Sequence, residues 1–326
     1  MPRNAELRPA RTLREDELVE LAQSLRKELD LRGGERLAKE WALEAASDLR
    51  EGRLSGWGRP VGPEGVGELG FYSRRGTRAF GHVHVSPGPD GPARALELLE
   101  RMATDPELGG LPLSVGVTGL SADAERALAE TWSDGGRRST ILREGLERGL
   151  DATHVPPAEP VPPGLVAVAV ARVTAAALAE LDWRGFRGSL DGRLFANDPA
   201  ENRAMVDYLL AGGLGPFLPE ASLALLDESG RLAAALLSVE LSPRIALIAD
   251  LVVDPALRRR GLGAHLLRGS FRALRALGYD SVRLWVTEGN DAARRLYERL
   301  GFERYETARL FLQSEAEPLP QPQAAR

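Results

Sequence analysis

The second half of the chain alternates apolar runs with short turn sequences in a way that predicts consecutive strands. The run ASLALLDE (221–228) is separated from RLAAALLSVEL (231–241) by Ser-Gly, and RIALIADLVV (244–253) follows. Apolar runs rich in β-permissive residues on either side of turn residues are typical of antiparallel strands. We therefore expect a hairpin over 221–241 and a further strand over 244–253.

Apolar spacing then changes to a helical period. Leu267, Phe271 and Leu274 recur at intervals of three and four residues within 261–277, and Gly278 follows directly. This spacing places the three side chains on one helix face, and glycine is a common helix stop. We expect a helix over 261–277 that ends at Gly278.

A strand and a short helix complete this region. SVRLWV (281–286) alternates in polarity, as a half-buried strand does. NDAARRLYERLG (290–301) then predicts a helix with Asn290 as its N-cap and Gly301 just beyond its end. The order is strand, helix, strand, helix, which predicts a crossover after the hairpin.

The apolar segment LVAVAVARVTAAALAEL (165–181) resembles a membrane span only superficially. Arg172 and Glu180 interrupt it before it reaches the length that a bilayer requires. We expect a strand followed by a helix here, and no membrane association.

The same layout recurs earlier in the chain at a constant spacing of 168 residues. Val253 and Pro255 correspond to Val85 and Pro87, GAHLLRGSFRA corresponds to ALELLERMATD, and NDAARRLYE corresponds to ADAERALAE. Three blocks that match without a gap predict two copies of one fold.

The proline-rich stretch HVPPAEPVPPG (154–164) separates these copies and predicts an extended linker. The C-terminal EPLPQPQAAR predicts a frayed tail. The chain of 326 residues also exceeds a comfortable single core. The expected division is a first domain over 1–152, a linker over 153–164, a second domain over 165–315 and a flexible tail over 316–326.

Net charge and the absence of cysteine exclude several classes of function. The formal net charge of −5 argues against nonspecific nucleic-acid binding, which needs a positive surface. The sequence has no cysteine, which excludes disulfides, thiolate metal sites and a cysteine nucleophile. The first sixteen residues lack the apolar core of a secretory signal, so we expect a cytoplasmic protein.

The most informative stretch is LRRRGLGAHLL (257–267). A strand that ends at Val253, Pro255 after it, and Gly261 and Gly263 at the start of a helix together predict an anion site. The first amides of a helix lack backbone acceptors and point along a favourable dipole, and glycine permits close approach of a phosphate. A solvent-facing, arginine-rich helix start is the alternative.

Two common nucleotide motifs do not match. No Lys-Ser or Lys-Thr follows the glycines, so the stretch is not a P-loop. A dinucleotide fingerprint needs three glycines and an acidic residue at the end of the next strand, where this chain has WVTEGN.

The pattern R-x-x-G-x-G formed by Arg258, Gly261 and Gly263, followed by NDAARRLYERLGF (290–302), resembles the GNAT superfamily of acetyl-CoA-dependent N-acetyltransferases. The resemblance covers residues 165–312 well and residues 7–146 more faintly. It implies an α+β fold with two GNAT-like domains, each a mixed, mostly antiparallel sheet whose splayed central strands are flanked by helices. A tandem arrangement with the active site in the second copy is known in the superfamily.

The resemblance further implies that acetyl-CoA is the cosubstrate and that no metal takes part. Pantetheine would lie between the splayed strands against the backbone of 251–253, and the pyrophosphate on the amides of 259–264. Asn290 would contact pantetheine besides capping its helix, and Arg258 and Arg294 would reach phosphates. The expected cofactor-binding residues are Leu251, Val252, Val253, Arg258, Arg259, Arg260, Gly261, Leu262, Gly263, Ala264, Asn290 and Arg294.

Transfer to an amine requires a neutral nucleophile and a proton for the departing thiolate. The resemblance gives Tyr297 the role of the acid, and a phenol of pKa about 10 is able to protonate a thiolate of pKa about 8.5; packing on the sheet is its alternative role. For the base, the sequence offers Asp250 within an apolar run, Glu240 on the preceding strand, or a water chain. Burial would raise the pKa of Asp250 toward a useful range. Alternation places Asp250 and Val252 on one face.

The first copy has lost these features. At the 168-residue spacing Arg258 becomes Asp90, and Gly261 and Gly263 become alanines; Tyr297 becomes Ala129 and Asn290 becomes Ala122. We expect that this copy neither binds coenzyme A nor catalyses, and that it packs against the second copy. His82 and His84 lie on one face of a strand, but no third ligand for a metal is evident.

The predicted function is transfer of an acetyl group from acetyl-CoA to a primary amine of a small molecule or peptide, by direct attack in a ternary complex. The alternatives are a noncatalytic acetyl-CoA-binding regulator and an interaction scaffold. The acceptor, the length of the acyl chain, the base and the oligomeric state stay open.

Overall fold

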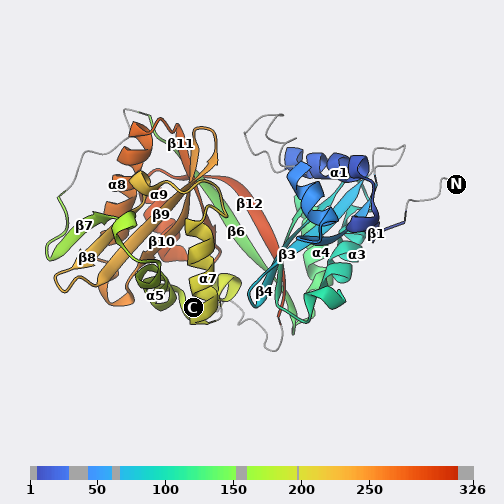
Figure 1. Ribbon diagram of the computed structural model, residues 1–326, viewed down its shortest axis with the longest axis horizontal. Helices are drawn as coiled ribbons and strands as arrows, with labels where there is room; N and C mark the ends of the chain where they lie inside the picture. Colours follow the sequence, from blue (N-terminus) through green and yellow to red (C-terminus); the bar gives the residue numbers. More distant parts are fainter. Residues whose placement is uncertain (1–5, 29–42, 61–66, 152–159, 197, 315–326) are drawn as a thin grey trace. The chain divides into compact units, whose positions relative to one another are not determined.

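The computed structural model of the chain describes residues 6–28, 43–60, 67–151, 160–196 and 198–314. Most of the predicted linker and all of the predicted tail lie outside these residues. The chain forms two compact units, one of residues 1–143 with 308–326 and the other of residues 144–307 (Figure 1). Among the described residues, no helix is both long and apolar enough to cross a membrane.

The two units repeat one order of elements, as the sequence repeat predicts. Each copy begins with a strand, a 3-10 turn and a helical segment, which comprises three helices in the second copy, and continues with three antiparallel strands, a helix, a strand, a helix and a final strand. In the first copy the elements are β1 (Arg8–Pro9), α1 (Glu15–Glu28), β2 (Ser55–Arg59), β3 (Glu68–Arg75), β4 (Arg78–Val85), α3 (Gly91–Ala103), β5 (Leu113–Thr118), α4 (Ala122–Trp132) and β6 (Arg138–Gly149). In the second copy they are β7 (Leu165–Ala169), α5 (Ala175–Phe186), α6 (Leu190–Phe195), α7 (Pro199–Leu210), β8 (Leu223–Asp227), β9 (Leu232–Ser242), β10 (Ile245–Val253), α8 (Leu262–Ala276), β11 (Ser281–Thr287), α9 (Asp291–Arg299) and β12 (Glu303–Gln313).

The local predictions for the second copy are confirmed. The segment 165–186 is a strand followed by a helix, and β8 and β9 form the predicted hairpin. Gly278 and Gly301 follow the ends of α8 and α9 with φ values of 90° and 80°, where L-residues are strained and glycine is not.

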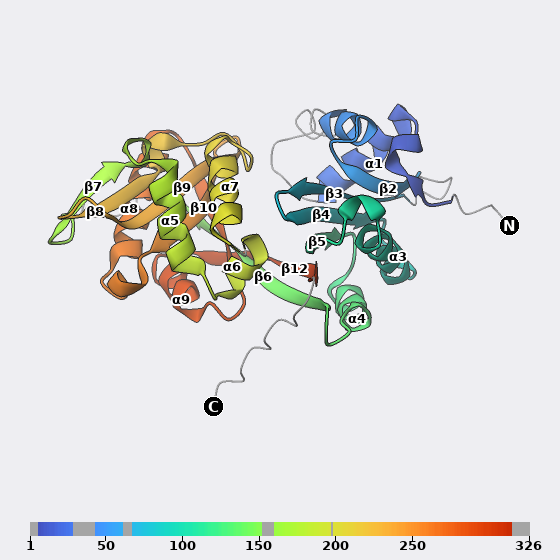
Figure 2. The ribbon, with the colours of Figure 1, turned by 60° about the horizontal axis from the view of Figure 1, so that its bottom comes forward.

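Helices cover both faces of the sheet in unit 2. Alternate residues of β9 point to opposite faces, so that Ala234 and Leu236 pack with α8, while Ala235 and Leu237 pack with α5 and α7. Figure 2 shows α5 and α7 together on one side of β9 and β10. The two apolar clusters are therefore separated by the sheet.

The last strands of the two copies are exchanged between the units. Residues 310–313 of β12 pair antiparallel with β5 in unit 1, although β12 follows α9 of the second copy. Residues 144–149 of β6 belong to unit 2, where Ser281 donates to Glu147 at 2.7 Å. The unit boundaries thus differ from the predicted division at 152 and 165, because strand pairing over a long sequence separation decides them.

The prediction of splayed central strands is correct for the second copy and wrong for the first. In unit 1, β4 and β5 are parallel and paired from Ala79↔Leu113 to His84↔Thr118, which includes every residue of β5. Gly119 then lies so close to the end of β4 that a Cβ there would be 1.7 Å from the Val85 oxygen. The first copy is therefore closed at the position where the second opens.

Candidate functional site

The parallel strands β10 and β11 separate after a short paired segment. Their pairing runs from Ile245↔Ser281 to Leu247↔Arg283, whereas the strands continue to Val253 and Thr287. Both strands are fully described, so the end of pairing is a property of their geometry. The backbone of β10 beyond Leu247 faces a gap that no hydrogen bond from β11 closes, and this gap includes the predicted residues 251–253.

A bulge on the other edge of β10 sets the direction of Asp250. The register with β9 shifts between Ile248 and Asp250, which pair with Ser238 and Leu237. A bulge increases local twist and re-aims the side chains that follow it. Asp250 thereby points toward α5, on the same face as Val252, as alternation predicts.

The loop after β10 leads into a helix start with free donors. Asp254 caps the 3-10 turn Pro255–Leu257 by accepting from the Ala256 amide at 3.0 Å. Arg259 and Gly261 have φ values of 63° and 78°, so the chain turns sharply before α8. Such a turn directs successive amides to one side, which is the geometry of an anion-binding concavity.

The first intrahelical bond of α8 runs from the His265 amide to the Gly261 oxygen at 3.0 Å. The amides of Leu262, Gly263 and Ala264 precede that bond and are the donors that a helix leaves without an internal acceptor. A Cβ at Gly263 would lie 3.2 Å from Leu296 Cδ2, with Leu251 and Val253 close behind. Glycine at this position thus brings the helix start close to both β10 and α9.

Helix α9 presents the two residues that the sequence singled out. The Asn290 side chain accepts from the Ala293 amide at 3.3 Å, which confirms the predicted N-cap. Tyr297 is buried and its ring packs edge-on against Phe302, with centroids 5.7 Å apart. The ring is therefore held in one place, and the role of its hydroxyl stays a prediction.

Two carboxylates meet between α5 and β10. Asp182, on α5, is only 9 % exposed, and its carboxyl lies near enough to that of Asp250 for the two groups to affect each other's pKa. Burial raises the pKa of both groups, and the charge of Asp182 raises that of Asp250 further. Raised pKa values mean that these carboxyls keep a proton to higher pH than isolated aspartates do.

A third carboxylate contacts the end of the opposite strand, β11. Asp191, in the first turn of α6, accepts from the Thr287 hydroxyl at 2.5 Å and from the Asn290 amide at 3.4 Å. Its charge also raises the pKa of Asp250. Because Thr287 ends β11 and Asn290 begins α9, Asp191 ties α6 to the β11 side of the gap. Sequence reasoning missed Asp182 and Asp191, since neither lies in a motif.

Glu240 lies beside the start of the gap, at the end of β10 farthest from the turn before α8. It pairs with Ala246, near the start of β10, whereas the open end at Val253 pairs with Ala234. Six residues along a strand span about 20 Å. The Tyr279 hydroxyl donates to Glu240 at 2.6 Å, so the carboxylate has a local partner at the far end of the strand. The structure does not bring this predicted base to the other site residues.

The predicted phosphate ligands divide into two groups. Arg258 donates through Nη2 to the Gly185 oxygen at 2.5 Å and through Nε to the Val253 oxygen at 3.4 Å. Arg294 is exposed and lies 4.0 Å from Asp291 and 3.9 Å from Glu298. Arg259 and Arg260 are exposed at the turn.

In the first copy, the start of α3 and the strand pair β4–β5 carry side chains that bond to one another. Arg94, in the first turn of α3, donates to the Ser86 oxygen at 2.7 Å and forms an ion pair at 2.8 Å with the buried Glu68. His82 and His84 both contact the Thr118 hydroxyl, at 3.1 and 3.2 Å, and burial lowers the pKa of each to about 4. These histidines are neutral residues of the closed strand pair. Within the described residues, no group of three His, Asp or Glu side chains is arranged to hold a metal ion.

Comparison with known proteins gives a family for this region. Residues 177–302 match the family model described as acetyltransferase (GNAT) family. This segment runs from within α5 to the third residue after α9, so it contains the gap, the helix start of α8 and Tyr297.

Relatives and solved structures agree with the tandem layout. The chain is 29 % identical over 239 residues to a mycothiol acetyltransferase of Thermomonospora curvata, covering 69 % of this chain and 75 % of the relative. It superposes on a GCN5-related N-acetyltransferase of Sphaerobacter thermophilus with a TM-score of 0.64 and 18 % identity, over 99 % of this chain and 100 % of the other. A tandem GNAT protein from the clavulanic acid biosynthesis pathway gives a TM-score of 0.55 and 19 % identity, over 97 % and 100 %. At these identities the two structures show the fold.

Proposed function

Residues 177–302 form a domain of the GNAT acetyltransferase family, and from this premise we propose that the domain transfers the acetyl group of acetyl-CoA to a primary amine. The observation that carries the proposal is the gap between β10 and β11 that leads to the free amides of α8. An extended pantetheine arm fits the gap, and a pyrophosphate fits the helix start. The first copy, where the strands are paired, offers neither feature.

The residues present fit coenzyme A. The amides of Leu262, Gly263 and Ala264 would bind the pyrophosphate oxygens, and the backbone of 251–253 would hold the pantetheine amides. Glycine at 261 keeps side-chain bulk away from the turn, and the exposed Arg259 and Arg260 add positive charge. When bound, acetyl-CoA supplies the activated acetyl group.

The paired carboxylates supply a proton acceptor. The amine nitrogen attacks the carbonyl carbon, so a C–N bond forms, the C–S bond breaks and one amine proton must leave. Asp250 lies three residues beyond the last pair of β10 and β11, and burial raises its pKa well above that of a free aspartate, which makes its carboxylate a stronger base. A lysine-like amine of pKa about 10.4 needs such a base, whereas an α-amine of about 7.7 needs it far less.

The buried Tyr297 is the proposed acid. Its hydroxyl would donate a proton to the departing thiolate, while amides of Leu251 or Val253 would polarise the carbonyl oxygen. The packing of its ring against Phe302 fixes the direction of the hydroxyl. Asn290 caps α9 and thereby holds Tyr297 in place.

The test is release of free thiol from acetyl-CoA in the presence of a panel of primary amines. The name of the Thermomonospora relative makes amines related to mycothiol the first acceptors to try. Longer acyl donors in the same assay define the acyl preference. Amine-dependent thiol release supports the proposal, whereas binding of acetyl-CoA without turnover on any amine favours a noncatalytic regulator.

A further inference from the structure

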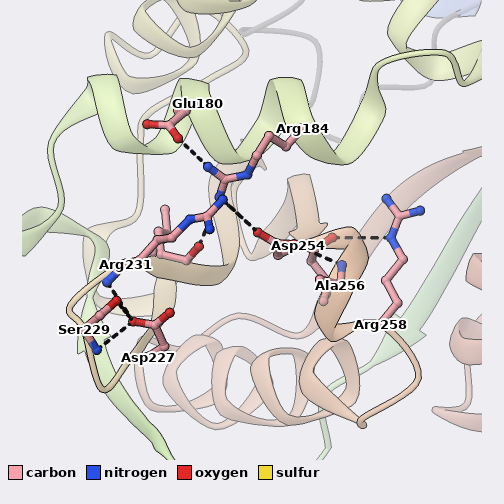
Figure 3. Close-up of polar contacts among 10 residues, drawn as sticks. Glu180, Arg184, Asp227, Ser229, Arg231, Asp254, Ala256 and Arg258 are labelled. Atoms are coloured by element: carbon pink, nitrogen blue, oxygen red, sulfur yellow. Dashed lines mark hydrogen bonds and ion pairs between the residues drawn. The ribbon is translucent and has the colours of Figure 1, made fainter.

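Helix α5 is joined to β10 and the following loop by three polar contacts in succession. Asp182 lies beside Asp250 closely enough to affect its pKa, Arg184 forms an ion pair with Asp254, and the Gly185 oxygen accepts from Arg258. The three residues on α5 lie within one turn of the helix. Their partners lie at positions 250, 254 and 258, in the same order along the chain. Figure 3 shows Arg184 reaching from its helix to Asp254, with Arg258 on the adjoining loop.

The guanidinium group of Arg184 contacts two carboxylates. Its Nη2 is 3.1 Å from Asp254, a residue that is only 9 % exposed, and its Nη1 is 2.5 Å from Glu180. Asp254 also accepts from the Ala256 amide at 3.0 Å, so the same carboxylate shapes the start of the loop. Arg231 also approaches Asp254, to 3.7 Å (Figure 3).

Arg258 makes the reverse connection, from the loop to the helix. Gly185 is in the last turn of α5, where carbonyls have no internal donor, and a cationic side chain at a helix C-terminus is favoured by the dipole. The guanidinium bonds that carbonyl at 2.5 Å. A Cβ at Gly185 would lie 2.3 Å from Val252 Cγ2, so the helix end lies directly on β10 at this point.

We propose that Arg258 is a positioning residue, which holds the C-terminal end of α5 against β10 and the loop, and that it is not a phosphate ligand. The proposal rests on the proposed function, and it changes the role that the sequence pattern suggests for the first arginine of R-x-x-G-x-G. Two donor groups of the side chain are already committed to the Gly185 and Val253 oxygens. Loss of Arg258 would therefore loosen α5, with Asp182, from β10.

The experiment compares two ligands that differ in phosphate. Coenzyme A and pantetheine are titrated calorimetrically into the wild type and Arg258→Met, which retains the apolar part of the side chain. Removing a charged hydrogen bond that orders the site predicts a loss of about tenfold in affinity, equal for both ligands. A loss confined to coenzyme A would overturn the proposal, because pantetheine has no phosphate; so would no loss for either ligand.

Arg260→Met is the matched control, since it removes one exposed arginine from the same loop. This substitution is expected to lower the affinity for coenzyme A and to leave the affinity for pantetheine unchanged. Arg258→Lys should recover part of the lost affinity for both ligands, because an ammonium group is also able to cap Gly185.

Two further readouts separate positioning from simple loss of structure. In the ligand-free protein, amides at the end of α5 should exchange faster with deuterium in Arg258→Met than in Arg260→Met. Unchanged exchange rates at the end of α5 would contradict the positioning role of Arg258. A wild-type protein that bound no coenzyme A would contradict the proposed function, and the exchange experiment would still test the role of Arg258. With an amine acceptor, the acidic limb of the pH profile of turnover should move to lower pH in Arg258→Met, because Asp182 and Asp250 separate.

Discussion

The two copies of the fold differ most at their central pair of parallel strands. In the first copy β4 and β5 are paired through the last residue of β5, and Gly119 closes the end against Val85. In the second copy β10 and β11 are paired over three residues and then diverge. The same order of elements thus gives a continuous pair of parallel strands in the first copy and a diverging pair in the second.

The turns that follow these strands differ in the same sense. Gly261 and Gly263 open α8, while Ala93 and Ala95 occupy those positions in α3, where Pro92 lacks an amide hydrogen. Arg94, in the first turn of α3, donates to the Ser86 oxygen and forms an ion pair with Glu68. The first turn of α3 thus carries a charge pair that belongs to the protein itself. A fold can therefore keep its architecture and lose an anion site through a few local changes.

The largest effect is expected at the turn before α8. Gly261→Glu should reduce affinity for coenzyme A by more than about a hundredfold, because it adds a negative charge beside the phosphate site and a side chain at a φ of 78°. Calorimetric titration measures it. Ala93→Glu, the counterpart in the first copy, should leave the affinity unchanged, and a loss there would show that the closed copy also binds.

The next effect concerns the proposed acid. Tyr297→Phe should lower turnover on the order of 10²-fold with little change in affinity for coenzyme A, because general acid catalysis is commonly worth that much. Steady-state kinetics and titration check the two halves of this statement. Tyr279→Phe, which removes a hydroxyl bonded to Glu240, is the control. Full turnover in the Tyr297 variant would disprove the assignment.

A third change breaks the closed strand pair. Gly119→Ala should lower the free energy of unfolding by roughly 2–3 kcal/mol, since a Cβ would meet the Val85 oxygen at a φ of 87°. Gly135→Ala, with a φ of 72° and no atom within 4 Å, isolates the cost of the backbone conformation alone. Denaturant unfolding measures both. Equal losses would mean that the close approach to Val85 is not important.

The smallest effect is a dependence of stability on pH. Burial raises the pKa of Asp182 to about 6, so the folded protein retains a proton that the unfolded chain releases near pH 4. Stability from this group is therefore fully present below about pH 4 and is lost as pH rises through 6. Asp182→Asn should remove a difference on the order of 2–3 kcal/mol between pH 4 and 8.

Asp207→Asn, an exposed partner of Arg203, is the control for this pH series. Its unfolding curve should follow the wild type at every pH. An unaltered pH dependence in Asp182→Asn would show that folding does not raise the pKa of Asp182.

Features of the second copy that depend on neighbours in sequence were predictable. The hairpin of β8 and β9, the helix α8, the Asn290 cap and the glycines after the helices all follow from local spacing and turn chemistry. The glycine and arginine pattern also located the helix start correctly, because the amides that it exposes belong to the pattern itself.

Features that depend on distant pairing were not predictable. The exchange of β6 and β12 joins residues that are far apart in the chain, and no local signal marks it. Asp182 is one acid among the polar positions of a helix, and only packing on β10 gives it a partner. Glu240 and Asp250 were equivalent candidates in the sequence, and the register of β9 with β10 separated them.

The central claim is that one copy is open and the other closed, and the stoichiometry of coenzyme A binding to the intact chain tests it most directly. The intact chain is required because β6 and β12 cross the boundary between the units. The account predicts one site per chain, lost in Gly261→Glu and retained in Ala93→Glu. Two sites per chain, or one that survives Gly261→Glu, would contradict it.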